Sequence, residues 1–467
     1  MLDQDMTKHW LFERLAEFND ETAIIWRDQR HSYRDVLDYV RQWQDQLNKY
    51  RVKVGDSVAL VGDYSPQSCT LLLALIANRC ITVPIAVSAL HQSRDLLKIA
   101  DVKFIFEFDK NDEWKFSQAQ GSDSHPLLEQ LRNEGEPGLV VFSSGSTGDY
   151  KGSLHNFNRV LDKFQARRRA YSALTFLLLD HLGGINTLLS ILSNGGTVIS
   201  IAERNPQHIC QAIERYRVQL LPTTPTFLNM LMISEAYKEY DLSSLELITY
   251  GTEPMPDHTL QSLRGVFPDV RLKQTYGLSE LGVMRTHSRD SQSLWLKVGG
   301  EGVETKVVDG TLWIRSQAAM MGYLNASSPF DDDGWYNTQD SVEVDGEYLR
   351  ILGRTSEIIN VGGVKVYPAE VENVLQQMSN IREVIVWGKP NSVSGQVVAA
   401  RVRLFEPEDS LDLERRMRGF CRSHLAAYKI PMVLEIVDGD LHSDRFKKVR
   451  NLSDRSELRV KHSAASN

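Results

Sequence analysis

Cysteine is scarce in this sequence, and the placement of its four cysteines excludes several kinds of site. They lie far apart, form no Cys-x-x-Cys pair and stand in no cluster with histidine, which argues against a disulfide framework or a structural zinc site. A basic excess is also lacking. The chain has 53 Lys and Arg against 61 Asp and Glu, and its formal net charge of −8 disfavours a nucleic-acid-binding protein.

Two further absences concern secretion and membranes. The N-terminal segment lacks the basic region and following apolar run of a signal peptide. The most apolar stretch, residues 70–87, contains Asn78 and Arg79 and is too short to span a bilayer. With 42% hydrophobic and 24% charged residues over 467 positions, the composition is that of a globular protein. We therefore expect a cytoplasmic enzyme with two or three domains.

The order of apolar runs predicts the fold class. Up to about residue 275, short buried strands alternate with helices; the run at 174–179, for example, is interpreted as a strand. Such alternation is typical of doubly wound, largely parallel α/β sheets. From Gly300, hairpin signals at Asp309-Gly310 and Asp345-Gly346 indicate a β-rich subdomain. We predict a large N-terminal α/β domain over 1–355 and a small, mobile α+β domain over 356–467.

The most informative stretch is residues 141–152, Val-Phe-Ser-Ser-Gly-Ser-Thr-Gly-Asp-Tyr-Lys-Gly, which follows an apolar strand. Its glycines allow close backbone approach, and its N–H groups, hydroxyls and lysine suit an oligophosphate. The spacing is not that of a P-loop, because Asp149 and Tyr150 separate the last glycine from the lysine. A Ser/Gly-rich linker is the alternative. The residues assigned to phosphate binding are Ser143, Ser144, Gly145, Ser146, Thr147, Gly148 and Lys151.

Seven further motifs follow in order. They are Asp180-His-Leu-Gly-Gly, Leu221-Pro-Thr-Thr-Pro-Thr, Tyr250-Gly-Thr-Glu-Pro-Met-Pro, Gln274-Thr-Tyr-Gly-Leu-Ser-Glu-Leu-Gly, Gly334-Trp-Tyr-Asn-Thr-Gln-Asp, Gly353-Arg-Thr-Ser-Glu-Ile-Ile-Asn-Val-Gly-Gly and Val366-Tyr-Pro-Ala-Glu-Val-Glu. From about Leu139 to Leu452, this order resembles the acyl-adenylate-forming superfamily of acyl- and aryl-CoA synthetases, peptide-synthetase adenylation domains and firefly luciferase.

The resemblance implies a two-step reaction. A carboxylate attacks the α-phosphate of ATP·Mg²⁺ to give an acyl-adenylate and pyrophosphate, and a nucleophile then captures the acyl group. Such chemistry needs alignment and charge neutralisation more than proton transfer. By resemblance, Tyr276 stacks on adenine beneath Gly251, Thr252 and Glu253, Thr275 lies near the α-phosphate, Glu280 and Thr147 hold Mg²⁺, and Asp340 binds the ribose with help from Arg354. Taken singly, Tyr276 also suits a core aromatic, Glu280 a helix N-terminus, and Asp340 with Arg354 a surface ion pair.

The C-terminal lysine of the family departs from its usual pattern. Relatives read Leu-Pro-x-Thr-x-x-Gly-Lys before an apolar residue, whereas this chain reads Leu441-His-Ser-Asp-Arg-Phe-Lys-Lys-Val-Arg. Counting from Leu441 selects Lys448, which we favour slightly, and the spacing to Arg450 selects Lys447. The alternative for either lysine is a solvated basic run. Ser356 falls where relatives carry the hinge residue of a rotating small domain.

The acyl acceptor is predicted to be a thiol, either CoA, which we favour, or the phosphopantetheine of an acyl carrier protein. Gly362 and Gly363 resemble the lining of a pantetheine tunnel, and His181 resembles its gate, although it also suits a helix start. The basic residues Lys163, Arg167, Arg168 and Arg169 are interpreted as a receptor for the CoA 3′-phosphate or an acidic carrier helix, or as a solvated face.

The carboxylic acid is expected to be an aryl or medium-sized apolar acid, because no aspartate stands ready for an α-ammonium unless Asp180 turns inward. The pocket residues expected by resemblance are Gly184, Asn186, Thr223, Gly277 and Leu278. An amide-forming ligase and a non-catalytic nucleotide- or acyl-binding protein remain as alternatives.

Overall fold

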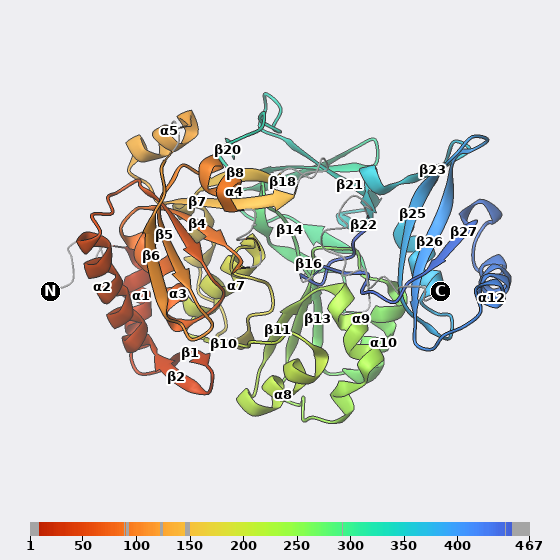
Figure 1. Ribbon diagram of the computed structural model, residues 1–467, viewed down its shortest axis with the longest axis horizontal. Coiled ribbons are helices and arrows are strands. Elements are labelled where there is room, and N and C mark those ends of the chain that lie inside the picture. The colour runs from red at the N-terminus through yellow and green to blue at the C-terminus, as the bar shows by residue number, and fades with distance from the viewer. Residues whose placement is uncertain are drawn as a thin grey trace, which may run out of the picture.

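The computed structural model describes residues 9–87, 89, 93–121, 125–144, 150–291, 293–443 and 445–450. A large α/β body and a smaller lobe, blue in Figure 1, make up the molecule. The body contains two seven-stranded, mainly parallel sheets, which confirms the predicted fold class.

The first sheet has the order β13-β12-β11-β9-β10-β1-β2, parallel except for β2. Its strands are β1 (Thr22–Trp26), β2 (Gln29–Ser32), β9 (Ser172–Leu174), β10 (Thr197–Ser200), β11 (Leu220–Thr223), β12 (Leu247–Tyr250) and β13 (Arg271–Gln274). The second has the order β20-β8-β7-β4-β3-β5-β6. Its strands are β3 (Ser57–Val61), β4 (Ile81–Ile85), β5 (Val102–Phe108), β6 (Trp114–Gln118), β7 (Gly138–Ser144), β8 (Tyr150–Asn156) and β20 (Gly322–Tyr323).

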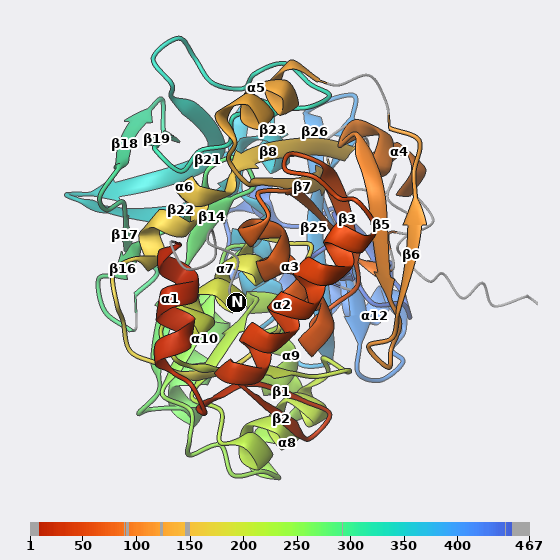
Figure 2. The same cartoon turned by 90° about the vertical axis from the view of Figure 1, so that its left-hand side faces the viewer.

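Helices connect and cover these sheets (Figure 2). They are α1 (Trp10–Glu17), α2 (Tyr33–Lys49), α3 (Pro66–Ala77), α4 (Ser93–Ile99), α5 (Pro126–Glu134), α6 (Phe157–Leu161), α7 (Leu182–Leu192), α8 (Pro206–Tyr216), α9 (Pro225–Ser234) and α10 (Asp257–Val266), with 3-10 turns η3 (Asp162–Phe164) and η4 (Ala236–Lys238). α3 shows why such elements form where they do: Ser65 and Ser68 close a capping box, Pro66 opens the first turn, and the apolar residues that follow are buried.

The β-rich part predicted after Gly300 is a six-stranded antiparallel sheet in the order β16-β17-β22-β21-β19-β18. Its strands are β16 (Thr286–Ser288), β17 (Leu296–Val298), β18 (Val303–Val308), β19 (Thr311–Ser316), β21 (Tyr336–Asp345) and β22 (Tyr348–Arg354). The separate hairpin β14 (Tyr276–Leu278) and β15 (Gly282–Met284) precedes it.

The small lobe has its own sheet, β24-β23-β26-β25, with β27 added parallel to β26. Its elements are η5 (Thr355–Glu357), β23 (Ile359–Val361), β24 (Val364–Val366), α11 (Pro368–Leu375), β25 (Ile381–Asn391), β26 (Gly395–Leu404), α12 (Ser410–Arg422), η6 (Ala427–Lys429) and β27 (Val433–Ile436). A separate apolar core fills it. The last strand of the body ends at Arg354 and the first of the lobe starts at Ile359, so the boundary of 355/356 remains a prediction within that connection.

One predicted strand is wrong. Only Leu174 of the run 174–179 belongs to β9, and the remainder is a loop leading to α7. Phe176 and Leu179 are buried in two different core clusters, so their apolar character serves loop packing rather than strand pairing. All four cysteines are free and buried. Among the described helices, none combines the length and apolarity that a membrane crossing would need.

Candidate active site

The predicted phosphate loop joins two antiparallel strands. β7 and β8 pair so that Ser143 lies opposite Lys151, and Ser144 opposite Tyr150. Gly145, Ser146, Thr147 and Gly148 lie outside the described residues. The Lys151 ammonium lies 5.2 Å from the centre of the Tyr323 ring. The element that leads into the loop is therefore a strand, as predicted.

Glu280, the predicted metal ligand, lies behind that ring. The Tyr323 hydroxyl donates to Glu280 Oε1 at 2.5 Å, and the Glu280 side chain is buried. Because carboxylate oxygens are preferred by hard cations, Glu280 fits Mg²⁺, while its predicted partner Thr147 is outside the described residues. Lys151, Tyr323 and Glu280 thus connect the phosphate loop with the candidate metal ligand.

Asp340 has a specific set of partners. Its Oδ2 accepts a hydrogen bond from the Tyr276 hydroxyl, and its Oδ1 lies 2.9 Å from Arg354 Nε. Arg354 also donates to the Thr338 carbonyl at 3.1 Å. Burial raises the pKa of Asp340, and the Arg354 charge partly offsets that rise. A buried carboxylate fixed from both sides differs from the surface ion pair considered above.

The segment after β12 is closely packed against the start of the β14 hairpin. A Cβ added at Gly251 would lie 2.4 Å from Thr275 Oγ1, so this position requires glycine. Thr275 Oγ1 donates to the Tyr250 carbonyl at 3.0 Å. Thr252 has a positive φ of 73°, which is unusual for a β-branched residue and is typical of functional loops.

His181 begins α7. Its Nδ1 accepts a hydrogen bond from Gly183 N at 3.0 Å, which is the helix-start role that the sequence left open. Burial, with the charges of Arg445 and Lys447, lowers the pKa of His181 to about 4. The imidazole is therefore neutral near pH 7.

The residues predicted to contact the acid surround this helix start and the β14 hairpin. A Cβ at Gly184 would lie 2.0 Å from the Leu178 carbonyl, and one at Gly277 would lie 2.9 Å from the Gly282 carbonyl. Thr223 is buried, and its Oγ1 has no hydrogen-bond partner among the described residues. Asn186 and Leu278 are half-buried. Close packing at the glycines fixes the backbone of both walls.

A contact that sequence reasoning missed holds the C-terminal segment on the large domain. Arg445 Nη2 lies 2.7 Å from Asp180 Oδ2, and the Asp180 side chain is only 7% exposed. The Phe446 ring packs 5.2 Å from Phe176, and its carbonyl accepts from Thr224 Oγ1 at 3.0 Å. The only sequence signal was a phenylalanine in the motif where relatives carry small or polar residues.

The two candidate lysines have different surroundings. Lys448 Nζ lies 2.7 Å from Glu372 Oε2, within the small lobe. Lys447 forms no ion pair with any residue in the described parts of the chain, but its charge acts on Asp340. Its side chain keeps contact with solvent, yet the surrounding protein and the Arg354 guanidinium lower the pKa of Lys447.

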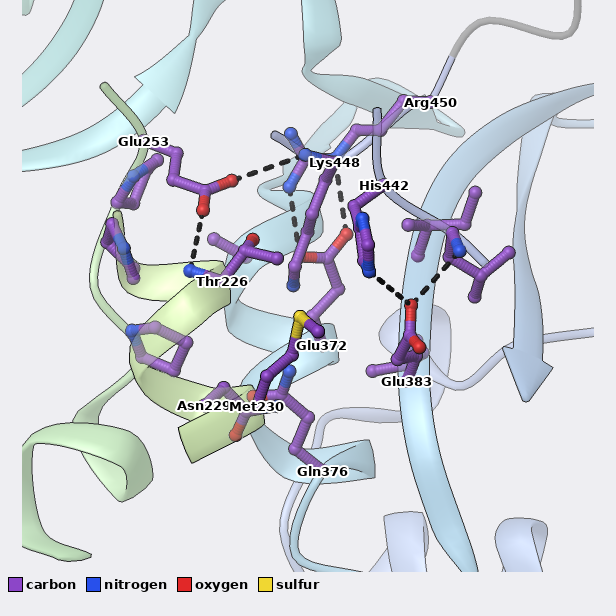
Figure 3. Close-up of a pocket in the computed structure, with 17 residues that line it drawn as sticks. Thr226, Asn229, Met230, Glu253, Glu372, Gln376, Glu383, His442, Lys448 and Arg450 are labelled. Atoms are coloured by element: carbon purple, nitrogen blue, oxygen red, sulfur yellow. Dashed lines mark hydrogen bonds and ion pairs between the residues drawn. The ribbon is translucent and has the colours of Figure 1, made fainter. Parts of the chain in front are cut away.

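Figure 3 shows the pocket between the two lobes beside these lysines. Glu253 spans it: its Oε1 accepts from Thr226 N at 2.8 Å, and its Oε2 lies 3.5 Å from Lys448 N. Glu372 accepts from both Lys448 and Arg450. Burial opposes ionisation of Glu372, but Arg450 and Lys448 lower its pKa to about 2. Glu372 is thus an ionised anchor for the C-terminal segment.

Replacing this anchor should destabilise the protein. We expect Glu372→Gln to cost about 3 kcal/mol, because two partly buried cations lose their counter-charge. In the wild type, this stabilisation is present above the ordinary glutamate pKa of 4.5 and is lost as pH falls towards 2. Urea unfolding should show the loss, whereas Glu370→Gln on the same helix, exposed and paired only with Lys429, should change stability by less than about 1 kcal/mol. Equal losses in both variants would contradict this role.

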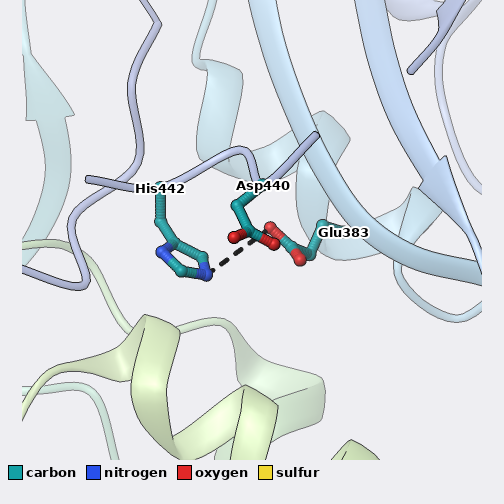
Figure 4. A group of neighbouring side chains, drawn as sticks. All are labelled: Glu383, Asp440 and His442. Atoms are coloured by element: carbon teal, nitrogen blue, oxygen red, sulfur yellow. Dashed lines mark ion pairs between the residues drawn. The ribbon is translucent and has the colours of Figure 1, made fainter. Parts of the chain in front are cut away.

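Glu383, Asp440 and His442 form a second cluster, shown in Figure 4. Their potential ligand atoms lie within 4.8 Å of one another. Arg403 already contacts both carboxylates, and its Nη1 is 2.9 Å from Glu383 Oε1. The guanidinium supplies the positive charge that a metal would bring, and we assign no metal to this cluster.

Gly363 and its neighbour are not brought together with the residues above. They form the turn between β23 and β24, with positive φ angles, and Gly363 N donates to Asn360 Oδ1 at 2.9 Å. That hairpin pairs with β26 of the small lobe. Their role in a tunnel stays a prediction, as does that of Ser356 in η5.

Comparisons with known proteins agree on the family. The model of the AMP-binding enzyme family matches residues 11–324, and that of the AMP-binding enzyme C-terminal domain matches residues 370–448. The chain is 32% identical to the indoleacetate–CoA ligase of Aromatoleum aromaticum, over 94% of this chain and 96% of that protein. It is 26% identical to the 2-succinylbenzoate–CoA ligase of Bacillus pumilus, over 92% and 94%.

The fold is also that of known ligases. The crystal structure of the anthranilate CoA ligase AuaEII in complex with anthranoyl-AMP superimposes with a TM-score of 0.81 at 20% identity, over 95% of this chain and 96% of that one. The family matches cover both lobes, and the relatives extend over nearly the whole sequence. The chain therefore belongs to the AMP-binding family of adenylate-forming enzymes.

Proposed function

We propose that this enzyme activates an aryl or medium-sized apolar carboxylic acid with ATP and transfers the acyl group to CoA. In the first step a carboxylate oxygen attacks the α-phosphorus, the bond to the bridging oxygen of the β-phosphate breaks, and pyrophosphate leaves. In the second step the CoA sulfur, having lost its proton, attacks the acyl carbon and AMP leaves.

The observation that carries the first step is the group formed by Asp340, Tyr276, Arg354 and Lys447. Asp340 has carboxylate oxygens suited to the two ribose hydroxyls, and Arg354 and the Tyr276 hydroxyl fix its orientation. The charge of Lys447 reaches Asp340 from the small lobe, which suits an ammonium that bridges the substrate carboxylate and the α-phosphate. Lys448 is committed to Glu372, so these contacts favour Lys447 over Lys448.

Mg²⁺, when bound, would neutralise phosphate charge and make pyrophosphate a better leaving group. Glu280 would hold it. The Tyr323 hydrogen bond leaves Glu280 Oε2 without a donor among the described residues, and Lys151 adds positive charge on the other side of the ring. The loop that contains Ser143, Ser144 and Lys151 would hold the β- and γ-phosphates.

Two features support the substrate classes. Asp180 accepts from Ala86 N and pairs with Arg445, so it does not face the pocket as an unpaired partner for an α-ammonium. The nearly full-length relatives named above are CoA ligases for aryl-bearing acids, which supports CoA as the acceptor.

ATP–pyrophosphate exchange without thiol or amine tests the first step. We expect exchange with aryl or medium-chain acids and none with α-amino acids. Adding CoA should then release a thioester. Thioester formation only with a phosphopantetheinylated carrier protein, or amide formation with an amine, would overturn CoA as acceptor. ATP binding without exchange for any acid class would contradict the activity itself.

The Arg445–Asp180 contact gives a further prediction. Arg445→Ala should slow exchange by about tenfold to a hundredfold, because Lys447 is carried on the segment that this ion pair fixes. Transfer of the acyl group from supplied adenylate to CoA should not fall, since that step does not need Lys447. Arg415→Ala, exposed and paired only with Asp412, is the matched control. An equal loss in both half-reactions would contradict this positioning role.

A further inference from the structure

The basic run after α6 is not used by the site described above, and the structure divides it. Arg167 pairs with Glu17, and Arg169 Nη2 lies 2.6 Å from Glu246 Oε2. Both of these arginines are therefore neutralised by surface carboxylates. Arg168, between them, forms no ion pair with any residue that the structure describes.

Arg168 gathers with three cations from separate segments instead. They are Lys163 in η3, Lys273 in β13 and Arg285 between β15 and β16. β13 and β16 lie side by side, because Thr286 Oγ1 donates to the Gln274 carbonyl at 2.6 Å. The Arg285 side chain lies against Gly300, where an added Cβ would be 3.2 Å from Arg285 Cδ. These neighbouring segments therefore place the four cations around one patch.

The patch runs from a buried amine to an exposed guanidinium. Lys163 Nζ donates to the Val283 carbonyl at 2.9 Å, and burial together with the charges of Arg168 and Arg285 lowers the pKa of Lys163 to about 7. The pKa of Lys273 is lowered by burial and by neighbouring arginines. Within the described part of the chain, no carboxylate forms an ion pair with any of the four.

Such a cluster is costly without a counter-charge. Like charges repel strongly where water is partly excluded, and this chain is acidic overall, so its carboxylates could have neutralised the patch, as they do for Arg167 and Arg169. Guanidinium groups bind phosphate oxygens through paired N–H donors, and a lysine adds a compact charge.

We propose that Lys163, Arg168, Lys273 and Arg285 form a second anion site, which binds a phosphate group. The site adjoins the nucleotide-binding strands: Val283 pairs with Gly277 in the β14 hairpin, and Lys273 stands three residues before Tyr276. A phosphate bound here would stabilise the hairpin that carries Tyr276. The inference does not depend on which acid or acceptor the enzyme uses.

The test compares variants of adjacent arginines. Calorimetric titration at constant ionic strength, with inorganic phosphate, pyrophosphate, CoA and 3′-dephospho-CoA in turn, should reveal binding that weakens about tenfold in Arg168→Ala and in Arg285→Ala. Arg167→Ala should bind as the wild type does, and Arg168→Lys should recover part of the loss. Any binding at the ATP site is common to all variants and cancels in the comparison.

The ligand arms identify the source. A loss seen with CoA but not with 3′-dephospho-CoA would assign the site to the CoA 3′-phosphate. A loss seen with phosphate or pyrophosphate would assign it to a free anion. Either supports the proposal, and in both cases the ligand should raise the pH at which Lys163 becomes reactive in reductive methylation read by mass spectrometry. Equal binding of every anion by Arg168→Ala and Arg167→Ala, or a response confined to an acidic carrier protein, would overturn it.

Discussion

Replacing Lys447 by alanine should reduce ATP–pyrophosphate exchange by about 10²- to 10³-fold, the range typical of losing one group that stabilises transition-state charge. The ammonium lies near Asp340 and Arg354, and its lowered pKa reflects the surrounding protein and that guanidinium. Acyl transfer from supplied adenylate to CoA should persist, because only the first step develops charge at the α-phosphate.

The neighbouring lysine is the matched control. Lys448→Ala should leave exchange within about threefold of wild type while it lowers stability, because Lys448 serves the buried Glu372. Both half-reactions and urea unfolding should be measured on both variants, at a temperature where each is folded by circular dichroism. A folded Lys448→Ala variant without exchange, beside an active Lys447→Ala variant, would reverse the assignment.

Asp340→Asn should lower kcat/KM for ATP by about 10²-fold, since a buried charge that accepts bonds from both sides is worth roughly 2–5 kcal/mol to its partners. The amide cannot balance the Arg354 charge, and one of its two positions can no longer accept a hydrogen bond. If Asp340 binds the ribose, the variant should also lose the wild-type preference for ATP over 2′-deoxy-ATP.

Asp345→Asn on the same strand provides the comparison. Asp345 is exposed at the end of β21 and pairs with Arg289, so its replacement should leave nucleotide preference unchanged. Retention of the full 2′-hydroxyl preference in a folded Asp340→Asn variant would show that Asp340 supports Tyr276 and Arg354 without touching the ribose.

The charge network explains why the two ends of the chain's C-terminal segment behave differently. Arg450 and Lys448 fasten it within the small lobe through Glu372, whereas Arg445 and Phe446 fasten it to the large domain. Lys447 lies between these two attachments. Its position is therefore set by both lobes together, and disturbing either attachment should affect the first step before the second.

The sequence by itself determined the family, the α/β class and most elements, because the eight motifs are local strings and the strand–helix alternation is a local periodicity. It also identified Asp340, Arg354 and Tyr276 as a group, although it gave no sign that the Tyr276 hydroxyl donates to Asp340. An apolar run alone does not distinguish a buried loop from a strand, and residues 174–179 were misassigned for that reason.

Tertiary structure decided what depends on direction and on distant partners. Lys447 and Lys448 are adjacent and chemically alike, and only the docking of their segment sends one side chain towards Asp340 and the other to Glu372. Arg445 meets Asp180 across 265 positions of sequence. The cations around Arg168 come from segments far apart in the chain. Electrostatic energy depends on distance in space, which spacing along a sequence does not contain.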